Sequence, residues 1–312
     1  MKAAFLTRGG MVLRDRPRPK AGRGEVVVRF AGIGVCTGDL EAWRRRESME
    51  PGLEAPIGHE ASGTVVEVGP GVRGFARGDR VTVMGGHYQQ FEALREADLA
   101  RLPDGVDLLW ALGEPMACCV HACNRSGIRL GDRVAVVGCG FMGLMCMQIS
   151  LAQRAGEVVA VDPVAWRRQT ARKLGAARAL SPEQASDEAP DWHHGCYDVV
   201  IEAAGTGPAL DLCGRLVRQH GCINIVGYHQ SREGLRTIDM KQWNYKALTV
   251  VNGHIRRIDE KLAAMRAGVD LLAAGRVTAK PLVTAYPLAQ AERAFQDLHA
   301  MKKGLFKAVL VP

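Results

Sequence analysis

The sequence predicts an α/β fold in which a doubly wound parallel sheet accompanies a β-rich, barrel-like domain. Two patterns carry this prediction. From residue 133 onward, apolar runs rich in valine and isoleucine alternate with segments of helical spacing, which is typical of a parallel sheet. Before residue 84, short apolar runs are bounded by glycine and proline, which is typical of a compact β domain.

The centre of the chain reads as a strand, a glycine turn, a helix and a second strand. An apolar run leads into the turn, helical spacing follows from residue 141 to 154, and a second apolar run ends at Asp162. Gly138 allows a tight turn, Gly140 lets a pyrophosphate approach the backbone, and Gly143 lets the helix sit close on its strand. Asp162 is placed to accept hydrogen bonds from an adenosine ribose. The residues expected at this dinucleotide site are Gly138, Gly140, Phe141, Met142, Gly143 and Asp162.

The remaining elements are expected in the following order. The first part of the chain contains strands at residues 1–6, 25–30, 56–69 and 78–83, and a helix at 114–125. After residue 162, helices 166–174 and 208–219 alternate with strands 197–201, 222–226 and 248–251. The last part contains helices 260–267 and 289–301 and the strand 307–311.

Five short motifs stand in a recognisable order along the chain. They are Cys36 with Asp39, Gly58-His59-Glu60, Gly78-Asp79-Arg80-Val81, Gly113-Glu114-Pro115 and the glycine turn. This series resembles the zinc-dependent medium-chain dehydrogenase/reductase family over essentially the whole chain, and the Glu-Pro pair resembles its polyol (sorbitol-type) and threonine dehydrogenase branch. The resemblance implies a GroES-like catalytic domain at residues 1–122, a Rossmann NAD-binding domain at 123–254, and a segment at 255–312 that returns to the catalytic domain.

Residues of the first part offer the ligands of a catalytic zinc, which needs three protein ligands and one open position. Cys36, His59 and Glu114 supply a thiolate, an imidazole and a carboxylate, and Glu60 is an alternative or transient ligand. Asp39 is expected to accept a hydrogen bond from the second ring nitrogen of His59. The alternative is a core thiol, a structural histidine and a helix cap.

The expected proton relay departs from the family pattern. Many family members carry Ser or Thr two residues after the zinc cysteine, and often His five residues after it; here these positions are Gly38 and Glu41, and Thr37 is displaced by one residue. One hypothesis is that Glu41 accepts the alcohol proton, directly or through a water, with Glu60 as a competing base. The alternative is that Glu41 faces solvent on a helix and the proton leaves through water.

The cysteines of the chain do not indicate a second metal site. Cys118, Cys119 and Cys123 fall on one predicted helix, where adjacent residues point about 100° apart, so buried packing is expected. The four-cysteine lobe that holds a structural zinc in many family members is missing after the strand 78–83, which implies one zinc per subunit at most. Nine scattered cysteines are typical of reduced thiols rather than of a disulfide framework.

The carboxylate of Asp162 favours NAD over NADP, because it would repel a 2′-phosphate, although Arg167 and Arg168 are close enough in sequence to pair with one. By resemblance, Ala204, Val226, Gly227 and Asn252 flank the nicotinamide, and His254 either points at it or is a solvated loop histidine. The resemblance further implies that zinc binds a substrate hydroxyl and lowers its pKa, so that the attached carbon gives hydride to NAD in the cleft between the domains.

Only the family resemblance indicates the class of substrate. A Cys/His/Glu zinc set is similar to that of enzymes acting on secondary alcohols of polyols, sugars, cyclitols or amino alcohols. Trp43, Tyr88 and Trp243 either line a pocket or pack in the core. Two alternatives stay open: a biosynthetic amino-sugar or aminocyclitol dehydrogenase, and a dinucleotide-binding protein without catalysis. The three zinc ligands argue against the second alternative, because dinucleotide binding does not require them.

Composition and hydropathy narrow the classes of partner and the cellular location that are expected. The net charge of +8 comes from scattered arginines, and Arg44-Arg45-Arg46 reads as a solvated helix face, so no nucleic-acid partner is expected. No apolar run approaches the length of a membrane span, and the first residues turn polar too soon for a signal peptide, so a cytoplasmic protein is expected. The apolar strand 248–251 predicts a symmetric homodimer or homotetramer that pairs along this edge.

Overall fold

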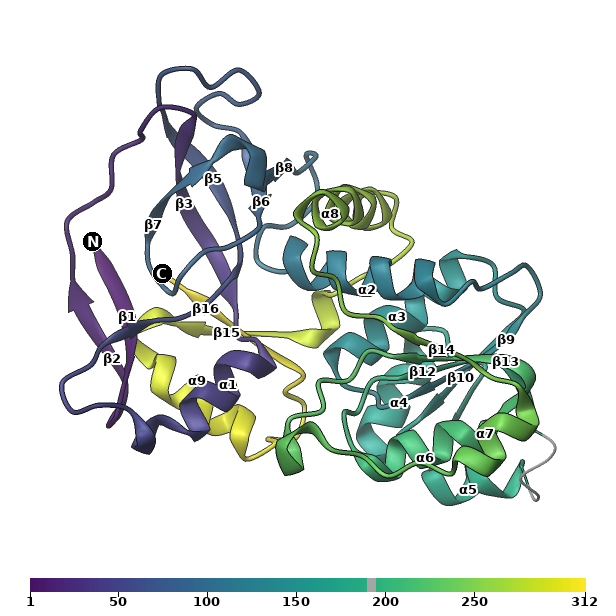
Figure 1. Ribbon diagram of the computed structural model, residues 1–312. Helices are drawn as coiled ribbons and strands as arrows, with labels where there is room; N and C mark the ends of the chain where they lie inside the picture. The colour runs from purple at the N-terminus through teal and green to yellow at the C-terminus, as the bar shows by residue number, and fades with distance from the viewer. Residues whose placement is uncertain (190–194) are drawn as a thin grey trace. The chain divides into compact units, whose positions relative to one another are not determined.

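The computed structural model describes residues 1–189 and 195–312, which form two compact units (Figure 1). The first unit comprises Met1–Ala117, Leu262–Gly275 and Ala279–Pro312, and the second comprises Cys118–Lys261 and Arg276–Thr278. Two helices, α2 (Gly113–Arg125) and α8 (Ile258–Ala273), carry the chain from one unit to the other. No helix within the described ranges is long and apolar enough to cross a membrane.

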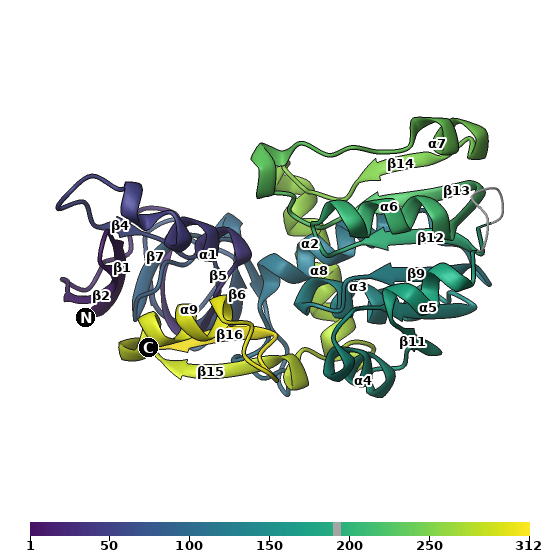
Figure 2. The same ribbon diagram turned by 90° about the horizontal axis from the view of Figure 1, so that it is seen from below.

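The second unit is built on a parallel sheet of six strands, which are seen side by side in Figure 2. Their spatial order is β11 (Arg178–Leu180), β10 (Glu157–Val161), β9 (Arg133–Val137), β12 (Tyr197–Glu202), β13 (Val217–Ile225) and β14 (Thr249–Asn252). The order runs outward in both directions from β9, as in a dinucleotide-binding sheet whose ligand lies at the carboxyl ends of its strands. The predicted doubly wound sheet is therefore confirmed.

The helices of the second unit are α3 (Phe141–Ala152), α4 (Ala165–Lys173), α5 (Pro182–Asp187), α6 (Gly207–Leu216) and α7 (Met240–Lys246). Helix α6 ends three residues before its predicted end. Its C-terminus is closed by the buried ammonium of Lys246, which donates to the carbonyl oxygens of Gly214 and Arg215 (2.9 Å each) and of Val217 (2.7 Å). A cation at this end also complements the helix dipole, and β13 begins at Val217.

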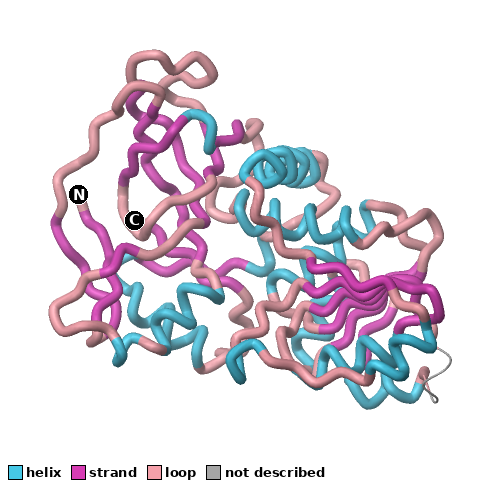
Figure 3. The backbone as a smooth tube through the Cα atoms, in the orientation of Figure 1, coloured by secondary structure: helices cyan, strands magenta, loops and turns pink. Residues whose placement is uncertain are grey.

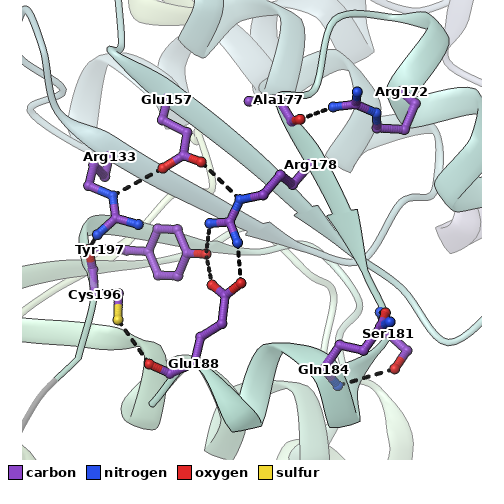
Figure 4. A network of polar contacts seen from close by, with 10 residues as sticks. All are labelled: Arg133, Glu157, Arg172, Ala177, Arg178, Ser181, Gln184, Glu188, Cys196 and Tyr197. Carbon is purple, nitrogen blue, oxygen red and sulfur yellow. Dashed lines mark hydrogen bonds and ion pairs between the residues drawn. The ribbon is translucent and has the colours of Figure 1, made fainter.

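A polar network joins the amino ends of four strands of this sheet (Figure 4). Glu157 of β10 accepts from Arg133 Nε of β9 (3.1 Å) and from Arg178 Nε of β11 (3.0 Å). Arg178 also pairs with Glu188, and the hydroxyl of the buried Tyr197 of β12 donates to Glu188 Oε2 (2.8 Å). Each group has a partner, so the hydrogen bond offsets the cost of burying the Tyr197 hydroxyl.

The first unit is dominated by strands (Figure 3). A seven-stranded sheet contains β15 (Val283–Pro287), β16 (Lys307–Val311), β3 (Glu25–Gly34), β5 (Glu60–Val68), β6 (Arg80–Val83) and β8 (Leu99–Arg101) in this order, with β7 (Phe91–Arg95) on β3. A small sheet contains β2 (Gly10–Asp15), β1 (Lys2–Thr7) and β4 (Ala55–Pro56). Only β15 and β16 pair in parallel among the described strands of this sheet. The β-rich domain that was predicted is confirmed.

Helices α1 (Thr37–Arg44) and α9 (Ala291–His299) cover the core of the first unit. Trp43 and Tyr88 are buried in this core, where both rings contact Phe295. The indole of Trp43 donates to Glu292 Oε2 at 3.0 Å, which ties α1 to α9. Trp243 is buried in the core of the second unit. Of the two roles considered for these three aromatic residues, the structure shows packing.

Candidate metal and dinucleotide sites

Three side chains of the first unit converge as a metal site requires. The sulfur of Cys36, a ring nitrogen of His59 and a carboxylate oxygen of Glu60 all lie within 4.8 Å of one another. The sheet brings them together, because β3 and β5 pair with Gly34 opposite Glu60. Cys36 then lies two residues beyond the end of β3, and His59 directly precedes β5.

Cys36 also begins the next helix. It is the N-cap of α1, and its sulfur accepts a hydrogen bond from the backbone N–H of Gly38 at 3.4 Å. Burial, followed by the charge of Glu60, raises the pKa of the Cys36 thiol to about 12. Only a thiolate is a good metal ligand, so a cation that binds here has to displace the thiol proton.

Asp39 lies beside the imidazole of His59, but the hydrogen bond expected between them is not formed. Its Oδ1 is 3.7 Å from Nδ1 of His59, which is an ion-pair distance and longer than a hydrogen bond. The other oxygen accepts from the buried Tyr88 hydroxyl (2.6 Å) and from the backbone N–H of Cys36 (3.3 Å). Burial and the charge of Asp39 raise the pKa of Tyr88 well above its usual value, so this phenol stays a donor.

Lys307, a residue that sequence reasoning missed, supplies the counter-charge of the cluster. It lies on β16 and is buried, and its ammonium is 2.5 Å from Oε2 of Glu60. Burial lowers the pKa of Lys307, but the charges of Glu60, Cys36 and Glu114 raise it more, so the net direction is upward. A lysine at the start of the apolar run 307–311 was the available signal.

Glu114 lies in the first turn of α2, and Gly113 before it donates to Thr82 Oγ1 of β6 at 2.7 Å. The charge of Glu114 acts on Lys307, but the converging group among the described residues contains Glu60 as its carboxylate. The assignment of Glu114 as a zinc ligand stays a prediction.

The donor set fits a catalytic zinc. Sulfur, imidazole nitrogen and carboxylate oxygen are the ligand types that zinc prefers, and three protein ligands leave a fourth position for water or substrate. The imidazole of His59 is 40% exposed, so the cluster is open to solvent on that side.

The structure shows the following neighbours for the residues considered for a proton relay. Among the described residues, a Cβ atom at Gly38 would meet only the Cys36 sulfur within 4 Å, at 3.9 Å. Thr37 is the first residue of α1. The carboxylate of Glu41 is held by Nε of Arg45, the C-cap of α1, at 2.7 Å and lies 3.6 Å from Arg44, the last residue of this helix.

The glycine turn of the second unit has the geometry that its sequence predicted. Gly138 has φ +106°, and a side chain there would meet the backbone nitrogen of Ala204 at 2.7 Å. A side chain at Gly143 would collide with the carbonyl oxygen of Gly138, so α3 packs directly on the turn. Gly140 faces open space: a Cβ atom at this position would have no neighbour within 4 Å among the described residues, as an approaching pyrophosphate would need. Phe141 and Met142 begin α3 directly after it.

Asp162 braces this turn from the end of β10. Its side chain is 4% exposed; one oxygen accepts from the Cys139 N–H and the other from the Val164 N–H, each at 2.8 Å. Arg167 lies 4.0 Å from the carboxylate, and Arg168 donates to the carbonyl oxygen of Asp162 at 2.7 Å. Both arginines are thus engaged at the carboxyl end of the strand.

Glu202, which the sequence did not single out, organises the neighbouring strand end. Its fully buried carboxylate accepts from the N–H groups of Ala204 (2.9 Å) and Gly205 (2.7 Å) and contacts Nε2 of His229 (2.9 Å). Because Arg236 Nε donates to Nδ1 of His229 at 2.7 Å, Nε2 must carry the proton that Glu202 accepts.

The two strand ends beyond it are ordered as well. The N–H groups of Val226 and Gly227 both donate to the backbone oxygen of Glu202 at 2.8 Å. The side chain of Asn252 accepts from the N–H of His254 at 2.9 Å. Burial lowers the pKa of His254, whose ring lies 5.6 Å from that of Tyr228. These residues line the carboxyl edge of the sheet, where such folds bind their ligand.

The buried cysteines pack between α2 and α3. The sulfur of Cys119 is 3.7 Å from the Met142 sulfur, and the Cys123 thiol points at the Cys146 carbonyl oxygen at 3.6 Å. Hydrogen bonding to Cys146, with burial, raises the pKa of Cys123 well above its usual value. The protonated Cys123 thiol and the buried Cys119 support the packing role expected for these two cysteines.

Comparisons with known proteins bear on the family of the chain. Residues 22–104 match the family model of the alcohol dehydrogenase GroES-like domain, and residues 142–273 match that of zinc-binding dehydrogenases, together more than two thirds of the chain. Sorbitol dehydrogenase of Gallus gallus is 28% identical over 332 residues, covering 92% of this chain and 90% of the relative.

Solved structures share the fold. A chain from Sinorhizobium meliloti, described as a zinc-binding dehydrogenase and solved with NADP, superposes with a TM-score of 0.88 at 24% identity, covering 100% of this chain and 99% of the other. Acetophenone reductase of Geotrichum candidum, solved with NAD, gives a TM-score of 0.82 at 22% identity, covering 100% and 97%. With the motifs and the two matched models, these findings show that the chain is an oxidoreductase of the zinc-dependent medium-chain dehydrogenase/reductase family.

Proposed function

We propose that the protein oxidises a secondary alcohol of a polyol, sugar, cyclitol or amino alcohol, using NAD and one zinc ion. The observation that carries this proposal is the convergence of Cys36, His59 and Glu60 in a chain that also has an open dinucleotide turn at Gly140. Cys36 and His59 would hold the zinc together with a carboxylate from Glu60 or Glu114. When bound, the zinc supplies a Lewis acid that lowers the pKa of a hydroxyl group, and the nicotinamide accepts hydride.

The surrounding residues would keep the ligands in place. Asp39, itself fixed by the Tyr88 hydroxyl, lies where it can orient the ring of His59. Lys307 holds the carboxylate of Glu60 and compensates its charge in a buried setting. In the second unit, Asp162 and Glu202 each accept two backbone N–H groups and so hold the loops at the strand ends. This rigidity would position the dinucleotide before the substrate arrives.

The choice of polyols rests on the relatives. Several curated relatives that cover nearly the whole chain are named sorbitol dehydrogenase, at 26–29% identity. At this identity the reaction type transfers more safely than the substrate, so sugars, cyclitols and amino alcohols belong in the same proposal. The preference for NAD over NADP rests on the carboxylate of Asp162.

The direct test is NAD reduction, followed by its absorbance, with panels of polyols, cyclitols and amino alcohols. We expect one panel to give kcat/KM at least tenfold above simple primary alcohols, and the Cys36→Ser variant to lose most of this rate. The proposal would be overturned if every substrate reduced NADP but not NAD. It would also be overturned if all alcohols, including primary ones, reacted at equal rates.

A further inference from the structure

The second unit contains a pocket at the end of its sheet opposite to the dinucleotide turn. It encloses about 300 Å³ between the C-terminal end of α2, the loop before β9 and the first residues of β12, β13 and β14. The residues that matter for its charge are Arg125, Arg129, Asp132, Asp198, Arg218 and His220. The glycine turn follows the carboxyl end of β9, so roughly 16 Å of strand separates the two places.

The two acidic residues of this pocket already have donors. Asp198 Oδ1 accepts from Arg218 Nε at 2.6 Å, and its Oδ2 accepts from the backbone N–H of Arg133 at 2.7 Å. Burial raises the pKa of Asp198, but these hydrogen bonds lower it more. Asp132 accepts from the backbone N–H of Arg129 at 2.7 Å. Asp198 is therefore occupied through both of its oxygens, and Asp132 through one of them.

The guanidinium groups of Arg125 and Arg129 are in a different situation. Neither makes a hydrogen bond or an ion pair with another residue in the described part of the chain, and both side chains are exposed. His220, in a left-handed backbone conformation with φ +56°, adds a further donor. Three arginines and one histidine line the pocket together with two acids, of which Asp198 is paired with Arg218, so the pocket has an excess of positive charge and of unused N–H donors.

We infer that this pocket, termed here the arginine pocket, binds the phosphate group of a small phosphorylated metabolite. Guanidinium groups bind phosphate oxygens through paired hydrogen bonds, and an anion between two arginines removes their mutual repulsion. The volume is larger than phosphate needs and falls at the lower end of the range for small-molecule sites. The organic part of the ligand would lie along Thr249 and Cys222, which also line the pocket.

The test uses the zinc-loaded enzyme saturated with NADH, so that the dinucleotide turn is filled. Glucose 6-phosphate and inorganic phosphate are titrated by isothermal calorimetry at an ionic strength held constant with KCl. We expect saturable binding of glucose 6-phosphate, weaker binding of phosphate, and a Kd at least tenfold higher for both in an Arg125→Gln/Arg129→Gln double variant. Arg129→Gln alone should raise Kd by an intermediate factor and serves if the double variant folds poorly.

The matched control is Arg8→Gln/Arg23→Gln, which removes the same charge from two exposed arginines of the first unit. We expect it to bind glucose 6-phosphate as the unchanged protein does. An equal loss in both double variants would show that net charge alone decides, and no saturable binding to the unchanged protein would show that there is no such site. Equal Kd values for phosphate and glucose 6-phosphate would show that the pocket recognises only a free inorganic anion. This result would contradict the proposal that it binds a phosphorylated metabolite. Each readout is independent of alcohol oxidation.

Discussion

Cys36 is the residue on which the metal proposal depends most directly. Cys36→Ser replaces the thiolate, and we expect the zinc content to fall from about one atom per subunit to a small fraction of that value. NADH binding should stay near normal, because the glycine turn belongs to the other unit. Metal analysis with a fluorescence titration of NADH measures both. Two tightly held zinc ions per subunit, or an active metal-free protein, would contradict this prediction.

Asp162 decides the preference between the two dinucleotides if charge repulsion acts as proposed. Asp162→Ser should raise the ratio of kcat/KM for NADP over that for NAD by about tenfold or more, which corresponds to ~1.4 kcal/mol. The ratio is the correct readout because the substitution also removes two acceptors of backbone N–H groups and should lower overall stability. Arg168→Gln is the comparison variant, and an unchanged ratio in Asp162→Ser would assign the choice to other residues.

One of the two hypotheses for the proton path was that Glu41 accepts the alcohol proton. Its ion pair with Arg45 leads to a definite expectation for the Glu41→Gln variant. The carboxylate is already engaged by Arg45 and lies close to Arg44, so Glu41→Gln should leave the pH–rate profile unchanged. A relay role would instead lower kcat by about 10²-fold near neutral pH, with partial recovery on addition of small exogenous bases. Steady-state rates from mildly acidic to alkaline pH separate the two outcomes.

At the scale of elements, the network in Figure 4 couples the stability of the parallel sheet to pH. Burial raises the pKa of Glu157, but hydrogen bonds from Arg178 and Arg133 lower it more, below the ordinary value of 4.5. A group with a lowered pKa in the folded state stabilises above its unfolded pKa and loses this contribution as the pH falls. Glu157→Gln should therefore reduce the free energy of unfolding at neutral pH, and the difference should shrink below about pH 4.5. Urea unfolding at neutral pH and below that value measures it; an equal loss at both would contradict the charge argument.

Tyr197→Phe isolates the neutral part of the same network. It removes the hydroxyl that donates to Glu188 but leaves the pair of Glu188 with Arg178. We expect a loss of about 1 kcal/mol in the free energy of unfolding, with no dependence on pH around neutrality. Because the aromatic ring stays buried, a loss several times larger would mean that packing was disturbed as well.

The elements that the sequence predicted are those with strong periodicity. The long strands and α3 were placed within a few residues. Their apolar runs indicate which residues are buried, and the glycines indicate where each element ends. The elements whose bounds were not predicted are short, polar or both, and they include β2, α1, β7, β8, β11, α5 and α7. Helix α1, for example, has the unusual N-cap Cys36, and α5 is a six-residue helix recognisable only by its Ser181 capping box.

The residues of the candidate sites also divide into those that a local motif indicates and those that only the folded chain brings together. Cys36, His59, the glycine turn and Asp162 stand in local motifs, so the sequence alone could single them out. Lys307 and Glu202 act through contacts with residues far along the chain, which no local pattern reports. The presence of Glu60 rather than Glu114 in the converging group has the same cause, since the pairing of β3 with β5 decides it.

At the scale of the whole molecule, edge strand β14 predicts self-association. β14 pairs only with β13 among the described strands, and Val250 on it is 42% exposed. Tyr245 and Met240 on the adjoining α7 are each 52% exposed, so an apolar surface continues along this edge. An exposed apolar edge of this kind invites pairing, and closed two-fold pairing keeps the association from continuing.

We therefore expect a homodimer or homotetramer at micromolar concentration, measured by sedimentation. Val250→Lys places a charge in the middle of the edge and should shift the protein toward monomer by at least tenfold in Kd, because burying an unpaired ammonium is costly. Leu53→Lys is the matched control, since Leu53 is 49% exposed on the first unit and the substitution adds the same charge. If both variants dissociate alike, net charge governs assembly, and a monomeric unchanged protein would remove the edge as an interface altogether.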